Sequence, residues 1–509
     1  MTAAPGLPDP VTRRFITASV LAATMMNSLD LTIANVALPH MQGSVSASSD
    51  QITWVLTSYI VAAAIFTPLT GWLAGRFGRR MLMMTSIFGF TAASMLCGIS
   101  NTIGELVGFR LLQGIFGAAL VPMSQAVLLD INPPERHGQA MAVWTMGAII
   151  APILGPVFGG WLTDNLTWRW VFFINLPVGV IAFIGLSVFL PRMKDKSPVR
   201  LDIFGFAALG IAVGALQLML DRGQQLDWFS SLEIRIEAGI FVLFLYLFIV
   251  QTLTARRPFV DLKLFTDRNF LACCLLGFIV GVLVFSVLAI LPQLLEGLMG
   301  YPVVTTGLVM APRGIGTFAA VLFVSRYARR VDGRLLILIG LGFNAVSMLM
   351  MSRVSLDMDA WIVINSGVVQ GIGTGLIFVP LATLAFATLT PAYRNEGAAM
   401  FTLIRNLGSS IGISALQVLA YRNGETVHAR LVEGLRPDNP IVATMPSIFS
   451  LTERGGLAAL GQAVQRQSMM VAMADSFWFL ACLTMFASLL LLFVRAPRAS
   501  GDPAPIPVE

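Results

Sequence analysis

The sequence predicts an all-α polytopic membrane protein with fourteen transmembrane helices, built as two related six-helix halves with two further helices between them. Three observations support this prediction. Hydrophobic residues make up 56% of the 509 positions and charged residues only 12%, and the mean hydropathy is +0.80. Long apolar runs recur along the chain, and two stretches repeat each other. Water-soluble domains carry about twice this share of charge, so lipid must be the solvent for most side chains.

The apolar runs are long enough to cross a bilayer. A helix rises 1.5 Å per residue, so about 20 apolar residues cross ~30 Å of hydrocarbon. The first run contains Asp30, which argues against a cleavable signal peptide. An even number of spans places both termini on one side of the membrane. The fourteen expected spans are 14–38, 51–73, 80–99, 103–128, 137–163, 169–190, 201–220, 232–252, 269–291, 303–324, 334–352, 360–380, 396–420 and 473–494.

The distribution of Lys and Arg predicts the orientation. With a cytoplasmic N-terminus, 21 of the 33 basic residues fall in the inner segments and nine in the outer loops. Basic residues concentrate in cytoplasmic loops. We therefore expect both termini to be cytoplasmic and the long segment 421–472 to be periplasmic. The net charge of +6 then reflects membrane orientation and does not indicate nucleic-acid binding.

An internal repeat divides the chain. Four pairs of segments match at offsets of 253 to 259 residues, so spans 1–6 correspond to spans 9–14 in the same orientation. Parallel-related six-helix halves are typical of the major facilitator fold. The matching pairs are 113–122 with 370–380, 133–141 with 391–400, 76–80 with 330–334 and 36–39 with 289–292.

The repeat and the spans together predict five regions. Residues 1–13 and 495–509 are cytoplasmic tails, and 14–190 is the N-terminal six-helix bundle. Residues 191–268 hold the two inserted helices, spans 7 and 8, with their cytoplasmic linkers. Residues 269–494 are the C-terminal six-helix bundle, including the periplasmic loop 421–472.

Asp30 and Arg110 are the candidate proton-coupling residues. A carboxylate in the middle of span 1 is costly in the membrane, so we expect Asp30 to face a cavity and to bind a partner or a proton. Arg110 in span 4 is permanently charged and long enough to reach a neighbouring helix. The counterpart of Asp30 in the repeat is Leu283, so the site belongs to the first half. The alternatives are a structural Asp in a kinked helix and an Arg that snorkels to the interface.

Two further segments have patterns with an ordinary structural interpretation. In span 5, small residues recur four apart on one face and favour close helix packing; its glycines and prolines are Gly147, Pro152, Gly155, Pro156, Gly159 and Gly160. Segment 71–80 reads as a tight basic turn, which the rule on cytoplasmic charge also explains; its candidate residues are Gly71, Arg76, Gly78, Arg79 and Arg80.

With these motifs in order along the chain, the sequence resembles the fourteen-helix drug:proton antiporters of the EmrB/QacA type, within the major facilitator superfamily. Segment 30–39 resembles the first-helix motif of that family, which includes Asn35 and Pro39. Segments 71–80, 110–114 and 147–160 resemble its loop 2–3, span-4 and span-5 antiporter motifs. The repeat register and the fold of the superfamily imply that the glycine face of span 5 packs against span 10, the counterpart of span 2. Segment 216–231 is similar to the EmrB branch in particular; its motif residues are Asp221, Arg222, Gly223, Asp227 and Trp228.

The resemblance implies a function and partners. It implies proton-coupled export of small hydrophobic compounds across a bacterial inner membrane, driven by the proton motive force without a cofactor. It also implies a periplasmic membrane-fusion adaptor and, through it, an outer-membrane channel. Segment 421–472 either docks that adaptor or is a solvated tether. The family motif usually has Asp where this chain has Gly75, which puts a gating charge relay at this loop in doubt.

Other functions remain as alternatives. A major facilitator that exports one specific metabolite or siderophore fits the same motifs. A membrane enzyme is disfavoured, because the three histidines (His40, His137 and His428) lie near loops and show no metal or nucleophile spacing. The four cysteines lie in apolar runs and are interpreted as packing residues.

Overall fold

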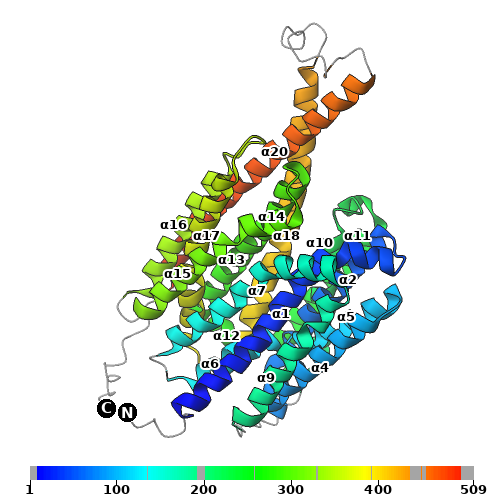
Figure 1. The fold of residues 1–509 in the computed structure, drawn as a ribbon. Coiled ribbons are helices and arrows are strands. Elements are labelled where there is room, and N and C mark those ends of the chain that lie inside the picture. Colours follow the sequence, from blue (N-terminus) through cyan, green and yellow to red (C-terminus); the bar gives the residue numbers. More distant parts are fainter. Residues whose placement is uncertain are drawn as a thin grey trace.

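The structure of the protein is a computed structural model, which describes residues 8–133, 136–191, 201–256, 258–327, 331–390, 393–435, 449 and 454–494. Regular structure within these residues is entirely helical. Most of the long helices run side by side in one elongated bundle (Figure 1). The all-helical prediction is confirmed.

The repeat predicts three groups of helices. The first group is α1 (Pro10–Ser44), α2 (Ser49–Phe66), α3 (Leu69–Phe77), α4 (Arg79–Ile99), α5 (Ile103–Gly117), α6 (Leu120–Ile131), α7 (His137–Asn165), α8 (Trp170–Phe173) and α9 (Asn175–Phe189). The inserted group is α10 (Ile203–Arg222), the short 3-10 helix η2 (Trp228–Ser230) and α11 (Leu232–Thr254).

The C-terminal group corresponds to the first group. It consists of α12 (Lys263–Thr266), α13 (Arg268–Pro292), the π-helical turn η3 (Gln293–Leu298), α14 (Val303–Met310), α15 (Pro312–Tyr327), α16 (Gly333–Met351), α17 (Ala360–Ala387), α18 (Arg394–Glu433), α20 (Arg454–Ala487) and the 3-10 helix η6 (Ser488–Phe493).

The membrane spans can be compared with the predicted fourteen. Among the described residues, twelve helices are long and apolar enough to cross a membrane, and the bent pair 51–77 brings the number to thirteen. α7 has 29 residues, enough for ~43 Å at 1.5 Å per residue, and coincides with the expected fifth span. The polytopic architecture is therefore present, and the number fourteen stays a prediction.

The two halves pack their helices in the same pairs. In the first half α1 contacts α7 and α9, α5 contacts α2 and α4, and α4 contacts α9. In the second half α13 contacts α18 and α20, α17 contacts α15 and α16, and α16 contacts α20. Each pair joins the same span numbers when spans 9–14 are counted as 1–6. Packing that repeats in this way is expected of a parallel duplication.

Span 2 is bent where the sequence predicted one continuous helix over 51–73. α2 ends at Phe66, α3 begins at Leu69, and the two axes differ by 59°. Pro68 lies at the break. Its ring lacks an N–H and clashes with the preceding helical turn, which is the usual cause of a sharp kink.

Segment 421–472 was predicted to be a loop, but its described residues are helical over 421–433 and 454–472. α18 continues to Glu433 and α20 starts at Arg454. With 40 and 34 residues, these helices extend well beyond the ~30 Å of a hydrocarbon core, and they rise above the rest of the bundle (Figure 1). Asn423 Nδ2 donates to Asp475 Oδ2 at 3.1 Å and ties the two extensions together.

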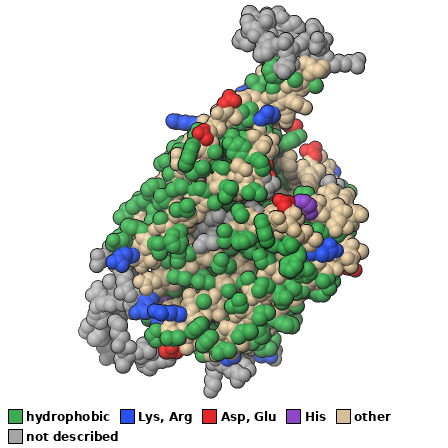
Figure 2. All heavy atoms as spheres, viewed as in Figure 1, with side chains coloured by type: hydrophobic (Ala, Val, Ile, Leu, Met, Phe, Trp, Pro, Cys, Tyr) green, Lys and Arg blue, Asp and Glu red, His purple; other side chains and the backbone are tan. Residues whose placement is uncertain are grey.

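The surface between the helix ends is apolar. Hydrophobic side chains cover most of the face in Figure 2, with Lys, Arg, Asp and Glu mainly toward its margins. Large side chains such as Phe88, Ile181 and Val242 are more than 60% exposed. Only 6% of the most apolar 18-residue stretch of α11 is buried. An apolar belt of this extent is stable only against lipid.

Candidate functional site

Asp30 lies at the centre of a buried polar cluster in the N-terminal half. Both side chains of the Asp30–Arg110 pair are fully buried, and Arg110 Nη1 donates to Asp30 Oδ2 at 2.6 Å. The other carboxylate oxygen, Oδ1, accepts from Gln113 Nε2 and from Asn175 Nδ2, each at 2.9 Å. The sequence-predicted pair is therefore in contact, and helices α1, α5 and α9 each contribute to the cluster.

The guanidinium of Arg110 is held from several sides. Its Nε donates to the carbonyl oxygen of Val55 at 3.0 Å, and Nη1 also donates to Gln113 Oε1 at 2.8 Å. The rings of Tyr59 and Phe172 lie 4.5 and 5.6 Å from its Cζ. This arrangement fixes the cation within the bundle, so Arg110 does not snorkel to the interface in this structure.

A second tier of side chains orients the cluster. Asn175 Nδ2 also donates to Ser94 Oγ at 2.9 Å, and Ser94 Oγ donates to the carbonyl oxygen of Phe172 at 2.9 Å. On the other side, Asn27 Nδ2 donates to the hydroxyl of Tyr59 at 2.8 Å. Side chains bound at both ends in this way have little rotational freedom, which preorganises the carboxylate.

The cluster can store a charge that one proton removes. Three donors surround the Asp30 carboxylate: Arg110 Nη1, Gln113 Nε2 and Asn175 Nδ2. A proton on either oxygen of Asp30 would displace a donor and leave the Arg110 charge without its counterion. In a low-dielectric interior an uncompensated charge is costly.

Two residues of the first-helix motif lie outside this cluster. Asn35 and Pro39 follow Asp30 on α1, and both side chains are exposed. Pro39 lies within the helix, five residues before its end at Ser44. Proximity in sequence to Asp30 therefore does not make them part of its hydrogen-bond network.

The glycines of the span-5 motif pack against span 1. A Cβ added at Gly155 would lie 2.0 Å from Thr32 Oγ1, and one at Gly159 would lie 3.3 Å from the carbonyl oxygen of Ile33. We expected the repeat register to pair this glycine face with span 10, and the structure corrects that expectation. α7 reaches span 10 through other residues: Val157 lies against Gly307.

The remaining motif positions on α7 differ from one another. Gly147 lies against Leu21, since a Cβ there would be 2.9 Å from Leu21 Cδ2. A Cβ at Gly160 would meet nothing within 4 Å. The side chains of Pro152 and Pro156 lie outside the described residues.

The loop 2–3 motif is mostly helix, which corrects its interpretation as a tight turn over 71–80. Residues 69–77 form α3, and the turn is confined to Gly78, whose φ of +87° favours glycine. Arg76 is exposed, and Arg80 donates to the carbonyl oxygen of Ser187. Gly75 has open space around it, since a Cβ there would meet nothing within 4 Å.

The same motif joins the two halves. A Cβ at Gly71 would lie 3.1 Å from the Cα of Glu396 on α18, so the glycine permits close approach. Arg79 forms an ion pair with Asp130 at the end of α6. Asp130 also lies 3.5 Å from Arg394 Nη1 at the start of α18. One carboxylate therefore bridges a cation from each half.

The branch motif forms the connection between α10 and α11. Asp221 accepts a hydrogen bond from Thr57 of α2, and Arg222 forms an ion pair with Glu233. Asp227 and Trp228 have positive φ values of 53° and 50°, and Trp228 packs on Gly223. The motif therefore shapes a turn and anchors the inserted pair of helices to span 2.

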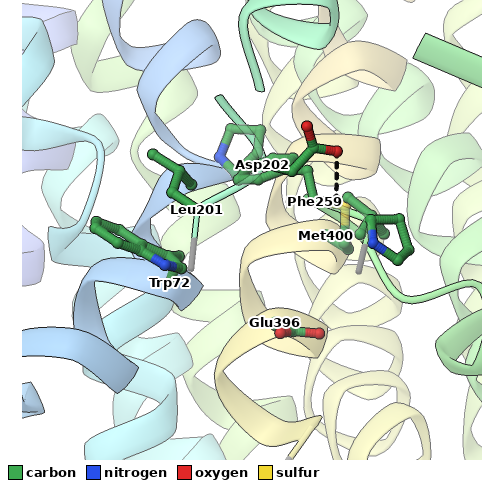
Figure 3. Close-up of a pocket in the computed structure, with 9 residues that line it drawn as sticks. Trp72, Leu201, Asp202, Phe259, Glu396 and Met400 are labelled. Carbon is green, nitrogen blue, oxygen red and sulfur yellow. Dashed lines mark hydrogen bonds between the residues drawn. The ribbon is translucent and has the colours of Figure 1, made fainter. Parts of the chain in front are cut away.

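A pocket lies where α3, the linkers of the inserted helices and α18 meet (Figure 3). Trp72, Phe259 and Met400 give it an apolar lining, and Asp202 and Glu396 are its acidic residues. Both oxygens of Asp202 accept hydrogen bonds, from Gly205 N and from Phe259 N. Among the described residues no group of three or more His, Cys, Asp or Glu side chains has the arrangement of a metal site.

Sequence reasoning missed the neutral members of the Asp30 cluster. Gln113 was part of the repeat that divided the chain, but its amide was not assigned to the site. Asn175 is the only amide within span 6, whereas Ser94 is one of several hydroxyl side chains in span 3. A buried amide in lipid needs a partner, so this isolation was the available signal.

Comparison with known proteins gives consistent results. Residues 20–413 match the profile of the Major Facilitator Superfamily. The "Multidrug export protein EmrB" of Escherichia coli (strain K12) is 36% identical over 495 residues, which cover 96% of each chain. The "Fatty acid resistance protein FarB" of Neisseria gonorrhoeae is 38% identical over 428 residues, which cover 83% of this chain and 84% of that one.

Solved structures share the fold. The human organic anion transporter MFSD10 (TETRAN) superposes with a TM-score of 0.62 at 14% identity and covers 95% of this chain and 100% of its own. The proton:xylose symporter XylE superposes with a TM-score of 0.63 at 13% identity, covering 96% and 97%. At such identities the likeness concerns the fold.

Proposed function

Because the chain belongs to the major facilitator superfamily, and so is a membrane transporter and not an enzyme, we propose that it is a proton-coupled antiporter that exports small hydrophobic or amphipathic compounds. The buried Asp30–Arg110 pair carries this proposal. It combines a group that can take up a proton with a fixed cation, and three helices of one half hold it together. Similarity to EmrB multidrug exporters along 96% of the chain supports the substrate class.

In this proposal proton and substrate alternate at a cavity between the halves. With Asp30 ionised, Arg110 and Gln113 hold α1 and α5 together. A proton that reaches Asp30 from outside weakens this connection and favours the return of the cavity toward the cytoplasm. Release of the proton inside restores the pair. The substrate leaves during the opposite movement, so the gradient drives its export.

The proposal includes topology and partners. We place fourteen spans in a bacterial inner membrane, with both termini in the cytoplasm and the limits of the two bundles as predicted from the sequence. The helical extensions of α18 and α20 would then project into the periplasm, where they offer a surface for a membrane-fusion adaptor. Through that adaptor the protein would form the inner part of a tripartite pump with an outer-membrane channel.

Proton flux in vesicles tests the central claim. Inverted membrane vesicles are given a preset pH gradient, and candidate drugs are added while the internal pH is followed. The parent protein should collapse the gradient upon addition of a transported drug. Asp30→Asn should abolish this flux while drug binding persists, because Asn is nearly isosteric with a protonated Asp and mimics the loaded state.

A matched acidic variant serves as the control. Asp202→Asn removes a carboxylate at the start of α10, where it caps a helix, far along the chain from the Asp30 cluster, and should retain drug-induced flux at matched expression. Equal proton flux in Asp30→Asn and in the parent would exclude Asp30 as the coupling residue.

A narrower substrate range is the second candidate. The similarity to a protein named for fatty acid resistance is the observation that favours it. Under this alternative one chemical class alone would collapse the gradient, and structurally unrelated drugs would have no effect. A panel of cationic, neutral and acidic compounds in the same vesicle assay separates the two candidates.

A further inference from the structure

A second buried cation lies in the C-terminal half, and it has no counterion in the described structure. Arg313 on α15 is only 6% exposed, and neither Nη1 nor Nη2 has a hydrogen-bond partner. Gln370 on α17 is 2% exposed, and its Nε2 is also without a partner. Both residues line one small cavity between α13, α15, α16 and α17.

This cavity corresponds to the Asp30 cluster of the first half. Gln370 is the repeat counterpart of Gln113, and Ser347, which also lines the cavity, lies 253 residues after Ser94. In the first half Gln113 donates to a carboxylate. In the second half the same position carries the same amide, but the carboxylate is absent because Leu283 replaces Asp30.

In the second half the guanidinium comes from a different helix of the repeat. Gly367 takes the place of Arg110 in the repeat, and a Cβ added there would lie 3.7 Å from the Cβ of Arg313. Arg313 itself occupies the position of Tyr59, because their carbonyl oxygens abut the corresponding glycines Gly371 and Gly114. The second half therefore retains a cation and an amide around a site that lacks an anion.

Protein carboxylates within the described second half do not fill this site. They lie near helix ends, in connecting segments or in the outer extensions of α18 and α20, and none lines the cavity. These residues are Glu296, Asp332, Asp357, Asp359, Glu396, Glu425, Glu433 and Asp475. A buried unpaired guanidinium is unfavourable, so an anion supplied from outside the protein would be strongly stabilised there.

We propose that the cavity around Arg313 and Gln370 binds the carboxylate of an amphipathic organic acid, which supplies the anion that Asp30 supplies in the first half. A planar guanidinium matches a carboxylate through two parallel hydrogen bonds, and the Gln370 amide supplies a further donor. The cavity measures only about 10 Å³ in this structure, so the apolar part of the ligand would bind along Val287, Leu291, Met310 and Met351 only after these side chains move apart. This inference rests on the proposed export function and names a substrate class for it.

Equilibrium binding tests the site without requiring transport. The full-length protein in lipid nanodiscs is titrated with decanoate and, separately, with decyltrimethylammonium, which has the same chain length and the opposite charge. Decanoate should bind, and Arg313→Gln should weaken its binding at least tenfold, as expected for loss of hydrogen bonds to a charged group. Binding of the cation should not weaken in the variant.

Two further variants separate a local defect from misfolding. Arg326→Gln removes an exposed arginine from the same helix and should bind decanoate like the parent. Gln370→Glu places a carboxylate beside Arg313, so it should reduce decanoate affinity even if Arg313→Gln fails to fold. Equal decanoate affinity in the parent, Arg313→Gln and Gln370→Glu would overturn the proposal.

The nature of the anion and the dependence on export are also distinguishable. If chloride alone protects the protein against heating through Arg313 while decanoate does not bind, the site is an inorganic anion site and the carboxylate assignment is wrong. If decanoate binds through Arg313 but no compound drives proton flux in vesicles, the binding site stands and the antiport proposal fails.

Discussion

The two halves of the molecule share a packing frame and differ in their charges. In the first half Gly155 of α7 approaches α1 so closely that a Cβ would meet Thr32 Oγ1. In the second half Gly408 of α18 approaches α13 in the same way, with a Cβ position 2.2 Å from the carbonyl oxygen of Phe278. The two glycines lie on corresponding helices but at different levels, because Phe278 corresponds in the repeat to Met25 and not to Thr32. The span-5 glycines therefore belong to the common scaffold and do not by themselves specify antiport.

The charged residues separate the halves. The first half neutralises Arg110 internally through Asp30, whereas Arg313 in the second half has no internal partner for its terminal nitrogens. An uncompensated buried charge is destabilising, so its presence is best explained by a bound ligand that compensates it. The comparison suggests a division of labour, in which the first half handles the proton and the second half recognises substrate.

The largest effect is expected from breaking the shared frame. Gly155→Val and Gly408→Val should each abolish transport, because a branched side chain would overlap the facing helix at both positions. Overpacking of a tight helix contact costs about 1–3 kcal/mol or more. Drug efflux and the melting temperature of the purified protein measure the two consequences.

Gly160→Val is the matched control for this experiment. A Cβ at Gly160 meets nothing within 4 Å, so the variant should insert, melt and transport like the parent. If Gly155→Val were damaging and Gly408→Val were harmless, the packing frame would not be equivalent in the two halves.

A smaller effect should distinguish the two counterpart glutamines. Gln113→Ala removes a donor to Asp30 and should reduce proton-coupled export of every substrate by about tenfold, the typical cost of one hydrogen bond to a charged group. Gln370→Ala should reduce export of carboxylates and leave that of cationic drugs near the parent level. Initial efflux rates of both compound classes in proteoliposomes provide the measurement. Equal losses for both classes in both variants would contradict the division of labour.

The contact between the halves should give a still smaller effect. Asp130 pairs with Arg79 within the first half and lies 3.5 Å from Arg394 of the second. Arg394→Gln removes only the contact across the halves, and partly exposed pairs of this kind contribute about 1 kcal/mol or less. We expect a few-fold increase in labelling of a Gly75→Cys reporter by a water-soluble thiol reagent, in purified protein without the native cysteines. Unchanged labelling would show that this contact does not hold the halves together.

Much of the fold followed from the sequence because its causes are local or periodic. Apolar runs predicted the helices, and the fixed offset predicted that the halves pack alike. The bend at Pro68 was also readable in principle, because proline disfavours the continuation of a helix, although Pro39 and Pro380 lie inside α1 and α17. The helical extent of 421–433 and 454–472 was not, because these polar segments carry no membrane signal.

Only the charged residues of the candidate site could be predicted from the sequence. Asp30 and Arg110 were identified because ionised groups are rare in spans and need partners. Their neutral partners Gln113 and Asn175 could not be assigned in the same way, because the sequence does not state which helix faces meet. The lack of a partner for Arg313 could not be predicted from the sequence either. Its unpaired state is visible only when its neighbours on α13, α16 and α17 are in place.

The smallest effect on transport is expected at the basic loops that precede α4 and α16. α4 begins after Gly78, which has a φ of +87° and no side-chain cap. α16 begins after Asp332, which accepts from Arg334 N at 2.9 Å and also binds the Arg334 guanidinium. These hydrogen bonds hold the pKa of Asp332 below its usual value. Asp332→Ala should therefore cost about 1 kcal/mol, as for other lost N-caps, without a transport defect.

The pH dependence of that cost identifies its origin. A carboxyl group with a lowered pKa in the folded state stabilises the protein above its unfolded pKa of about 3.9, and this contribution disappears as the pH falls through the folded value. The melting temperatures of the parent and Asp332→Ala should accordingly differ at pH 7 and converge in acid. Gly78→Ala should instead be destabilised equally at both pH values, because its cost is backbone strain at positive φ. A difference for Asp332→Ala that persists unchanged into acid would mean that its charge has no part in capping α16.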